Sequence, residues 1–408
     1  ERLRAQAQAE VRARRLPPQA GTEFTPRQRV RAVLDAIDRR PPAAVRGSST
    51  TLERELESAL RDHRRYAGEG LAAPAAAAIL PSLAQIQARL PAGTALVEFV
   101  TGRRGVHAVV VGRERAEALT LPIAADALQS KVELLHDLIG RPAGRDWRAP
   151  AASLHDALVA PIAARGALDG IGVLYVVPHG PLHFLPFAAL VAPDDQGGGF
   201  LVDRVAIAYL PSAALLLRPP SAGAARAGVL AVAPQRTRLR HAREEARRVA
   251  ELLGPRRLVL LGAGATESAF KREAPGYPVL HLATHGTFNA VSPDLSAVEL
   301  EADASDDGRL HAFEIASLSL GATQLVTLSA CRTALASGVI SDFPAGQDFV
   351  GLTQAFLAAG SRAVVATLWD VDDRATAALM ESFYAEAAHR DVAQALAMAQ
   401  RTMRQRGG

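Results

Sequence analysis

Short apolar runs alternate with longer amphipathic segments through the C-terminal half of this chain, and this alternation restricts the fold more than any other feature of the sequence. The runs predict strands at 228–233, 257–261, 279–283, 325–329 and 363–368. The segments between and after them predict helices at 241–253, after an N-cap at Thr266, at 347–359 before Gly360, at 373–388 and at 391–405. Short strands alternating with such helices imply an α/β fold, with a mainly parallel sheet flanked by helices on both faces.

The preceding residues divide into two further parts. Strands are expected at 95–100, 106–112 and 172–177, with a helix at 124–139. Residues 1–85 read as helical, since segment 50–65 begins with cap-type residues and repeats leucine every four positions. We therefore expect an N-terminal helical segment at 1–85, a first lobe at 86–220 and a second lobe at 221–408.

Composition excludes several classes of protein. The chain has 408 residues and is 49% hydrophobic, so it can bury a full core and is not a disordered polymer. A single cysteine, Cys331, rules out disulfide stapling and favours a cytoplasmic location. The sequence contains no run of about 18 apolar residues, so we expect no membrane-spanning helix. The net charge of +4 gives little reason to expect nucleic acid as a partner. The chain begins with Glu rather than Met, so we expect further domains upstream.

Two of the predicted strands lead into reactive residues. The run VLHLATHG leads to His285 and Gly286, and LVTLSACRT leads to Cys331, 46 residues after His285. Caspases have a cysteine in an Ala-Cys-[Arg/Gln/Gly] context with a histidine about 50 residues upstream, which resembles this arrangement. A thiolate beside an imidazole is a nucleophile suited to a peptide carbonyl. The backbone N–H groups of Gly286 and Cys331 would then form the oxyanion hole.

Other interpretations of these residues remain open. A lone apolar-flanked cysteine at a strand end is often a small core residue. His281 and His285 are four residues apart, but this spacing shares a face on a helix rather than a strand, so we expect His281 in the core and no metal. The stretch LGAGA at 261–265 lacks both the G-x-G-x-x-G pattern and a P-loop lysine, which argues against nucleotide binding. No cofactor is expected.

A family resemblance rests on several motifs in the same order along the chain. They are VVPHGPLHFLPFAAL (176–190), EEARRVAELLG (244–254), ATESAFK (265–271), VLHLATHGTFN (279–289), SAVELE (296–301), DGRLHAFEIASLSL (307–320), LVTLSACRTA (325–334), DFVGLTQAFLAAGSRAVVATLWDVDD (348–373) and MESFYAE (380–386). With them the chain resembles the CHAT domain, a caspase- and separase-like cysteine peptidase module found in bacteria downstream of TPR repeats.

The resemblance implies roles for particular residues. The catalytic histidine and cysteine of the family fall on His285 and Cys331. The first lobe would be a non-catalytic pseudo-protease lobe, in which His179 and His183 are structural. The helices of 1–85 would connect to upstream repeats. The chain departs from the family at Gly346-Gln347, where an acidic residue often follows the glycine.

The predicted function is that of a cysteine endopeptidase that cleaves a protein substrate and is gated by a partner or an upstream domain. The alternative is a catalytically silent CHAT scaffold for protein–protein interaction. The segment 332–346 contains Gly338, Pro344 and Gly346 and little periodic apolar content, so we expect it to be mobile and to shape the substrate groove.

Acidic residues near the end of the chain suggest which substrate residue precedes the scissile bond. The strand at 363–368 should lie beside the nucleophile strand, and it is followed by Asp370, Asp372 and Asp373. Carboxylates at this rim favour an arginine or lysine in the substrate, with Asp370 as first partner and Asp373 as second. The similar Leu-Trp-Asp-Val stretch of separase, which cuts after arginine, implies the same preference. Alternatively, Asp372 or Asp373 caps the following helix, and Asp373 is the favoured cap.

Overall fold

The computed structural model describes residues 58–59, 81–102, 104–140, 146–192, 199–218, 228–236, 239–287, 289, 293–329, 351–369 and 371–406. The chain divides into two units, Glu1–Leu80 and Pro81–Gly408. In the first unit the described residues, Ser58 and Ala59, are helical, and Ala59 is buried. The architecture below is that of the second unit.

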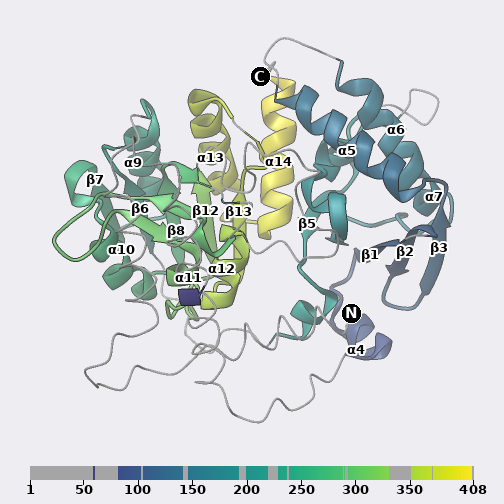
Figure 1. Cartoon of the computed structure of the whole chain (residues 1–408), viewed down its shortest axis with the longest axis horizontal. Coiled ribbons are helices and arrows are strands. Elements are labelled where there is room, and N and C mark those ends of the chain that lie inside the picture. The colour runs from purple at the N-terminus through teal and green to yellow at the C-terminus, as the bar shows by residue number, and fades with distance from the viewer. Residues whose placement is uncertain are drawn as a thin grey trace. The chain divides into compact units, whose positions relative to one another are not determined.

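A parallel sheet forms the C-terminal part of this unit, as the sequence predicts (Figure 1). Its strands lie in the order β13-β12-β8-β6-β7, and every neighbouring pair is parallel. They are β6 (Val229–Ala233), β7 (Arg257–Leu261), β8 (Val279–Ala283), β12 (Leu325–Ser329) and β13 (Ala363–Ala366). Because parallel strands end at the same edge, the residues that follow β8, β12 and β13 leave the sheet on one side.

Helices cover both faces of the parallel sheet. The reason can be seen along β8, where successive apolar side chains point to opposite faces. Leu280 and Leu282 point to one face, where they pack with Phe270 and Phe356. Val279 and Ala283 belong to the clusters on the opposite face. The first face is covered by α10 (Glu267–Glu273), α11 (Ala312–Ile315) and α12 (Leu352–Ala359), and the second by α9 (Ala242–Leu252) and α13 (Asp373–Ala387). A sheet buried on both faces accounts for the nearly continuous apolar runs.

A small antiparallel sheet adjoins the end of β8, and the sequence did not predict it. It consists of β9 (Gly286–Thr287), β10 (Ala297–Glu299) and β11 (Arg309–His311) in the order β11-β10-β9. Each strand has two or three residues, too few to produce a detectable alternation of polar and apolar positions. The strand β8 ends at Ala283, as predicted, and Gly286 begins β9.

A second five-stranded sheet precedes the parallel sheet in the chain and contains both parallel and antiparallel pairs. Its order is β3-β2-β1-β4-β5, with β1–β4 and β4–β5 parallel and the other two pairs antiparallel. The strands are β1 (Thr94–Gly102), β2 (Gly105–Val111), β3 (Ala116–Leu121), β4 (Val173–Val177) and β5 (Ala206–Tyr209). The strands expected at 95–100, 106–112 and 172–177 correspond to β1, β2 and β4, whereas β3 and β5 were not predicted.

Helices also pack on this mixed sheet. One face is covered by α5 (Ala125–Ile139) and α6 (Arg148–Leu158), whose leucines join the largest apolar cluster. The other face receives α4 (Leu83–Arg89) and the 3₁₀ helix η4 (Ala213–Leu217). Two short helices, α7 (Ala160–Ala163) and α8 (Leu201–Arg204), complete the lobe.

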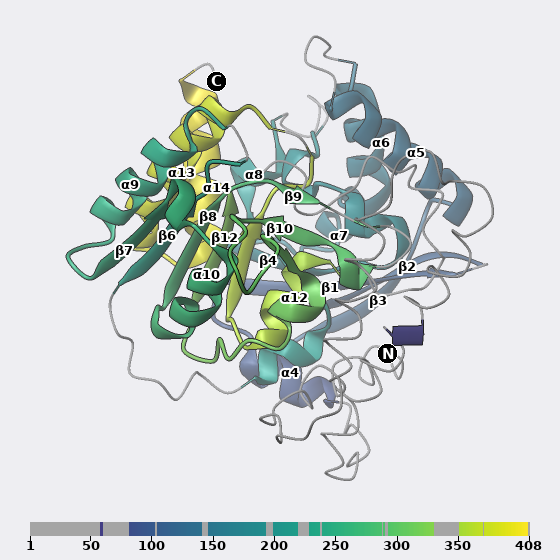
Figure 2. The same cartoon turned by 60° about the vertical axis from the view of Figure 1, so that its left-hand side comes forward.

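The last helix, α14 (Val392–Gln405), packs against both sheets (Figures 1 and 2). Ala395 and Ala399 join the cluster around α13, while Ala397 packs with Val173 and Ala206 of the mixed sheet. Near its end Arg401 donates to the backbone oxygen of Val202 at 2.6 Å. Among the described residues, the two five-stranded sheets are thus joined by side-chain packing on a shared helix, and no strand of one pairs with a strand of the other.

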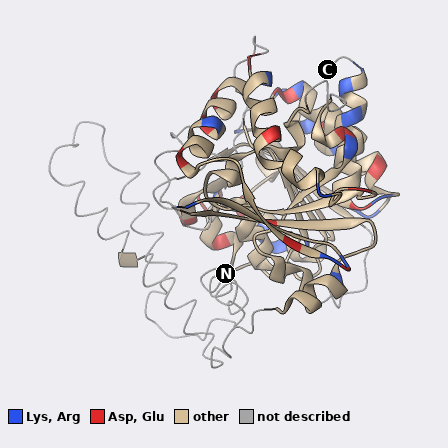
Figure 3. Cartoon of the chain, turned by 90° about the vertical axis from the view of Figure 1, so that its right-hand side faces the viewer, with Lys and Arg blue, Asp and Glu red and all other residues tan. Residues whose placement is uncertain are grey.

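Charges of both signs lie close together on the surface of the described residues. On the face drawn in Figure 3, basic and acidic segments alternate along the helices. No helix among the described residues is long and apolar enough to cross a membrane. The expected division at 85 and 220 remains a prediction.

Candidate active site

His285 lies between the parallel sheet and the small antiparallel sheet. It follows β8 by two residues, precedes β9 directly and is partly buried. Its carbonyl oxygen accepts the Glu299 N–H at 2.8 Å, and the buried Thr284 hydroxyl donates to the Glu299 carbonyl. The strand β10 therefore fixes the backbone on which the imidazole is carried.

Gly286 is buried and is the first residue of β9, the edge strand of the small sheet. It lies opposite Val298 in the antiparallel register. The hydrogen bond from Glu299 to His285 makes those two residues a hydrogen-bonded pair, so Gly286 and Val298 form the next, non-hydrogen-bonded pair. In such a pair the backbone groups point away from the partner strand, and the Gly286 N–H is therefore directed away from β10.

The strand β12 lies beside β8, and Ser329 is opposite Ala283 in the parallel register. Cys331 follows Ser329 by two residues and lies outside the described part of the chain, as do Asp370 and the segment 332–346. The role of Cys331, the basic-substrate role of Asp370 and the mobility of 332–346 thus remain predictions.

The prediction that the strand beginning at Ala363 lies next to the nucleophile strand is confirmed, because β13 pairs with β12. Beyond it, the expected helix cap falls on a different residue. Asp372 is the N-cap of α13 and accepts the Ala375 N–H at 2.8 Å, so the preference for Asp373 as the cap is wrong. Asp373 instead accepts the His241 N–H at the start of α9, also at 2.8 Å. Its proposed contact with substrate stays a prediction.

His281 is fully buried, as the sequence led us to expect. Its Nδ1 atom lies 3.1 Å from the Tyr384 hydroxyl, and its Nε2 atom lies 3.0 Å from the Glu245 carboxylate. Tyr384 donates in turn to the Thr327 hydroxyl at 2.7 Å. Burial raises the pKa of the Tyr384 hydroxyl, so this group stays protonated. In the first lobe, the Nδ1 atom of His179 accepts the Thr101 N–H at 3.1 Å, which fits the structural role expected there.

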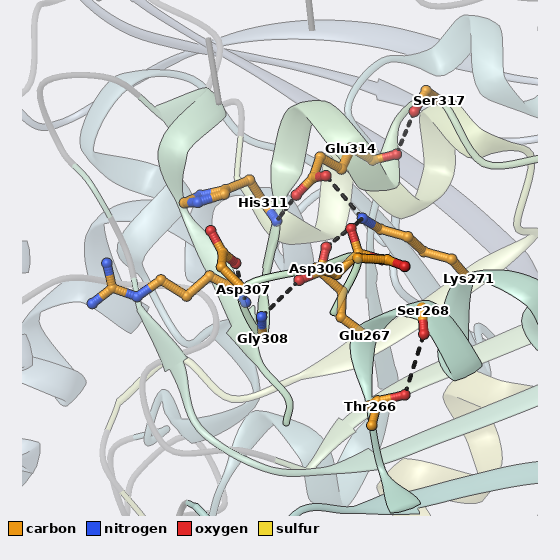
Figure 4. Close-up of polar contacts among 12 residues, drawn as sticks. Thr266, Glu267, Ser268, Lys271, Asp306, Asp307, Gly308, His311, Glu314 and Ser317 are labelled. Carbon is orange, nitrogen blue, oxygen red and sulfur yellow. Dashed lines mark hydrogen bonds and ion pairs between the residues drawn. The ribbon is translucent and has the colours of Figure 1, made fainter. Parts of the chain in front are cut away.

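A cluster of carboxylates around a lysine lies beside the small sheet (Figure 4). Glu267, Asp306 and Glu314 bring carboxylate oxygens within 4.8 Å of one another, as in a metal site. The Lys271 ammonium contacts all three, at 3.1 Å from Asp306 and 2.9 Å from Glu314. The position of a metal ion is therefore taken by the chain's own cation.

The cluster connects α10, α11 and the residues around β11, and it shifts the pKa values of its own members. Glu267 accepts the Gly308 N–H at 3.0 Å, and Glu314 accepts the His311 N–H at 3.1 Å. Burial, followed by the Glu314 charge, raises the pKa of Glu267 to about 7. The pKa of Lys271 is also raised, since the carboxylate charges outweigh its burial. The sequence analysis did not identify this cluster; its one local signal was the i, i+4 spacing of Glu267 and Lys271.

Comparison with known structures places this architecture in a class. The structure of separase from Saccharomyces cerevisiae, solved in complex with securin, superposes with a TM-score of 0.50 at 12% identity over 86% of this chain. The chain spans about a third of separase, 32% of its length. The Arg-specific cysteine proteinase gingipain R gives a TM-score of 0.42 at 10% identity, covering 69% of this chain and 70% of that protein. The fold is that of the caspase-like cysteine peptidases.

The sequence also identifies the family. Residues 148–407 match the CHAT domain, so this chain belongs to the CHAT family, as its motifs suggested. No curated protein matches the chain.

Proposed function

We propose that this protein is a cysteine endopeptidase in which His285 is the general base and Cys331 the nucleophile. The observation that carries the proposal is the parallel pairing of β8 with β12, in which Ala283 and Ser329 lie opposite each other. His285 and Cys331 each follow that pair by two residues. Adjacent strands are about 4.8 Å apart, and two residues of chain reach no further than about 7 Å. This pairing supports the dyad, because so short a stretch of chain beyond two neighbouring strand ends can bring His285 and Cys331 together.

The reaction follows from the chemistry of these groups. The imidazole of His285 takes the proton from the Cys331 thiol, and the thiolate attacks the scissile carbonyl carbon. The Gly286 N–H, directed away from β10, and the Cys331 N–H stabilise the negative charge that forms on the carbonyl oxygen. The imidazolium then protonates the leaving amine as the peptide bond breaks. Water, deprotonated by His285, hydrolyses the thioester and restores the thiol.

Substrate preference is assigned to the carboxylates that follow β13. Asp370 is the first candidate partner for an arginine or lysine side chain before the scissile bond. Asp373, which is partly buried and already accepts the His241 N–H, is the second. A carboxylate in a partly dry pocket favours a guanidinium, because the charge pair replaces the water lost by both groups.

We also infer that the peptidase acts on a protein substrate in the bacterial cytoplasm and is gated by a partner or by an upstream repeat domain. The support is the family membership and the need to restrain a dyad that would otherwise cleave cellular proteins. Cleavage assays with and without such a partner or repeat domain test the gating: the ratio of rates should change severalfold.

A peptide library tests the activity directly. We expect cleavage after arginine or lysine, abolished in Cys331→Ala and His285→Ala but retained in the control His389→Ala, which changes an exposed histidine after α13. The chain has one cysteine, so iodoacetamide alkylation reports on Cys331 alone. Rapid alkylation that slows in His285→Ala supports the dyad.

The alternative, a silent scaffold for protein binding, makes the opposite prediction. An inert Cys331 whose alkylation is unaffected by His285→Ala, with no cleavage of any library peptide, would establish the scaffold. Cleavage only after aspartate or aliphatic residues would leave the dyad intact and refute the role of Asp370.

A further inference from the structure

A buried polar network links four elements, among them the two strands that precede His285 and Cys331 in the sequence. Glu245 lies on α9, His281 on β8, Thr327 on β12 and Tyr384 on α13, and each is at most 5% exposed. The contacts run from Glu245 to His281 at 3.0 Å, from His281 to Tyr384 at 3.1 Å and from Tyr384 to Thr327 at 2.7 Å. The peptidase mechanism uses none of these groups.

The directions of the contacts define where the protons lie. Because the Tyr384 O–H donates to Thr327, its oxygen accepts from the Nδ1–H of His281. The Nε2 atom then faces the Glu245 carboxylate at 3.0 Å, which is an ion-pair distance. The Tyr384 hydroxyl thus bridges β8 and β12, whereas the Nε2 atom of His281 and the Oε1 atom of Glu245 lie at ion-pair distance without forming a hydrogen bond.

The register of β8 with β12 brings two members of this network together. His281 and Thr327 are directly opposite each other in the β8–β12 pair. The next pair on the same face is Ala283 with Ser329. In the sequence, His285 and Cys331 each follow this pair by two residues. His281 precedes His285 by four residues, which corresponds to about 13 Å of extended chain at a rise of roughly 3.3 Å per residue.

We propose that Glu245, His281 and Tyr384 are positioning residues that hold the ends of β8 and β12 in fixed register and separation, and thereby fix the geometry of His285 and Cys331. This inference rests on the proposed peptidase function. Apolar packing between these strands and the helices α9 and α13 tolerates small shifts, whereas directional contacts to two helices do not. A displacement of 1 Å between reacting groups can slow catalysis by about a hundredfold.

The test compares two tyrosines that lose the same atom. Tyr384→Phe removes the hydroxyl that joins β8 to β12. Tyr209→Phe is the matched control, because its hydroxyl, on β5 of the mixed sheet, also makes two hydrogen bonds, donating to the Leu185 oxygen and accepting from the Phe187 N–H. At a temperature where both variants are folded, we expect kcat to fall about tenfold in Tyr384→Phe with KM within about twofold of the parent. Tyr209→Phe should keep both constants.

A second variant tests the proposal independently, in case Tyr384→Phe does not fold. Glu245→Gln keeps the volume of the side chain and one oxygen near His281 but removes the charge. It should reproduce the loss of kcat with KM unchanged. Equal losses of kcat in Tyr384→Phe and Tyr209→Phe at equal stability would overturn the proposal, since a general loss of rigidity would then explain both.

Amide hydrogen exchange separates this inference from the peptidase proposal. In Tyr384→Phe, peptides covering Val279–Ala283 and Leu325–Ser329 should exchange about tenfold faster than in the parent, while Tyr209→Phe leaves them unchanged. This readout needs no substrate, so it decides the positioning of the strand ends even if the parent cleaves nothing. Unchanged exchange at both strand ends in Tyr384→Phe would refute the inference, whatever the peptidase assay gives.

Discussion

Single polar residues in the core of this protein are stabilised by partners that come from distant parts of the chain. Glu267 is fully buried, yet it accepts a backbone N–H from Gly308 and contacts the Lys271 ammonium. Ser329 is also buried, but its hydroxyl has no hydrogen-bond partner among the described residues. A buried polar atom without a hydrogen-bond partner destabilises the folded state more than one that has a partner. Substitutions at Glu267 and Ser329 should therefore have different effects on stability.

Glu267 should make stability depend on pH near neutrality. Its pKa is raised from 4.5 to about 7, so the folded state holds the proton more tightly than the unfolded state. The contribution is present in full below pH 4.5 and is lost as the pH rises through 7. Relative to Glu267→Gln, the parent should lose on the order of 1–3 kcal/mol between pH 5 and pH 8. Urea unfolding of both proteins across this range measures the difference, and parallel curves would contradict it.

Replacing Ser329 should cost little. Ser329→Ala removes a buried hydroxyl without a described partner, so the free energy of unfolding should stay constant or rise by up to about 1 kcal/mol. The matched substitution Ser361→Ala removes an equally buried hydroxyl that donates to the Phe356 oxygen at 2.8 Å and should lower stability by about 1 kcal/mol. Denaturant unfolding of the pair compares them, and a larger loss in Ser329→Ala than in Ser361→Ala would refute the assignment.

At the scale of elements, caps determine where the helices begin and end. The Thr266 hydroxyl accepts the Ala269 N–H at the start of α10, as the sequence predicted. Gly360 follows α12 with φ of +118°, a conformation that side chains rarely adopt, so glycine is suited to this position. The start of α13 carries two adjacent aspartates with different tasks: Asp372 caps its own helix, and Asp373 holds the first turn of α9.

Substitution of Asp372 can test its role as the helix cap separately from the role of Asp373. Asp372→Ala should lower stability by about 1 kcal/mol, because the N–H of Ala375 loses its acceptor, while Asp372→Asn retains the cap and should lose only a few tenths. Thermal unfolding measures both. If Asp372→Asn were as destabilising as Asp372→Ala, the charge rather than the hydrogen bond would be responsible.

At the scale of the whole second unit, the two sheets are joined by a shared helix and by individual arginines. Besides α14, Arg218 after η4 reaches the end of α12, where its guanidinium donates to the carbonyl oxygens of Leu357, Gly360 and Ser361. The last carbonyls of a helix lack intrahelical partners, so a cation there is favourable. This contact connects the first lobe to the helix that follows the predicted nucleophile loop.

Arg218→Ala should therefore lower the stability of the second unit by about 1.5–3 kcal/mol, the usual contribution of hydrogen bonds to a charged group. The control is Arg257→Ala, an exposed arginine with one described hydrogen bond, to Gly254 at 3.4 Å, which should change stability by no more than about 0.5 kcal/mol. Urea unfolding followed by circular dichroism measures both variants. Equal effects would mean that the contact with α12 contributes nothing.

The sequence by itself determined the elements whose signals are local. The apolar runs of β6, β7, β8, β12 and β13, the Thr266 cap and Gly360 could all be predicted because strand burial, capping and left-handed backbone each leave a pattern within a few residues. The parallel character of the sheet followed from the alternation of strand and helix, and the motifs identified the CHAT family.

Only the tertiary structure decided what depends on contacts between distant residues. The strands β9, β10 and β11 are too short to carry a pattern, and they form because each completes the hydrogen bonds of the next. Which of two adjacent aspartates caps α13 depends on where α9 lies. The partners of Lys271 and His281 come from segments up to 43 and 103 residues away, and such pairings arise from the packing of the elements, which no local pattern encodes.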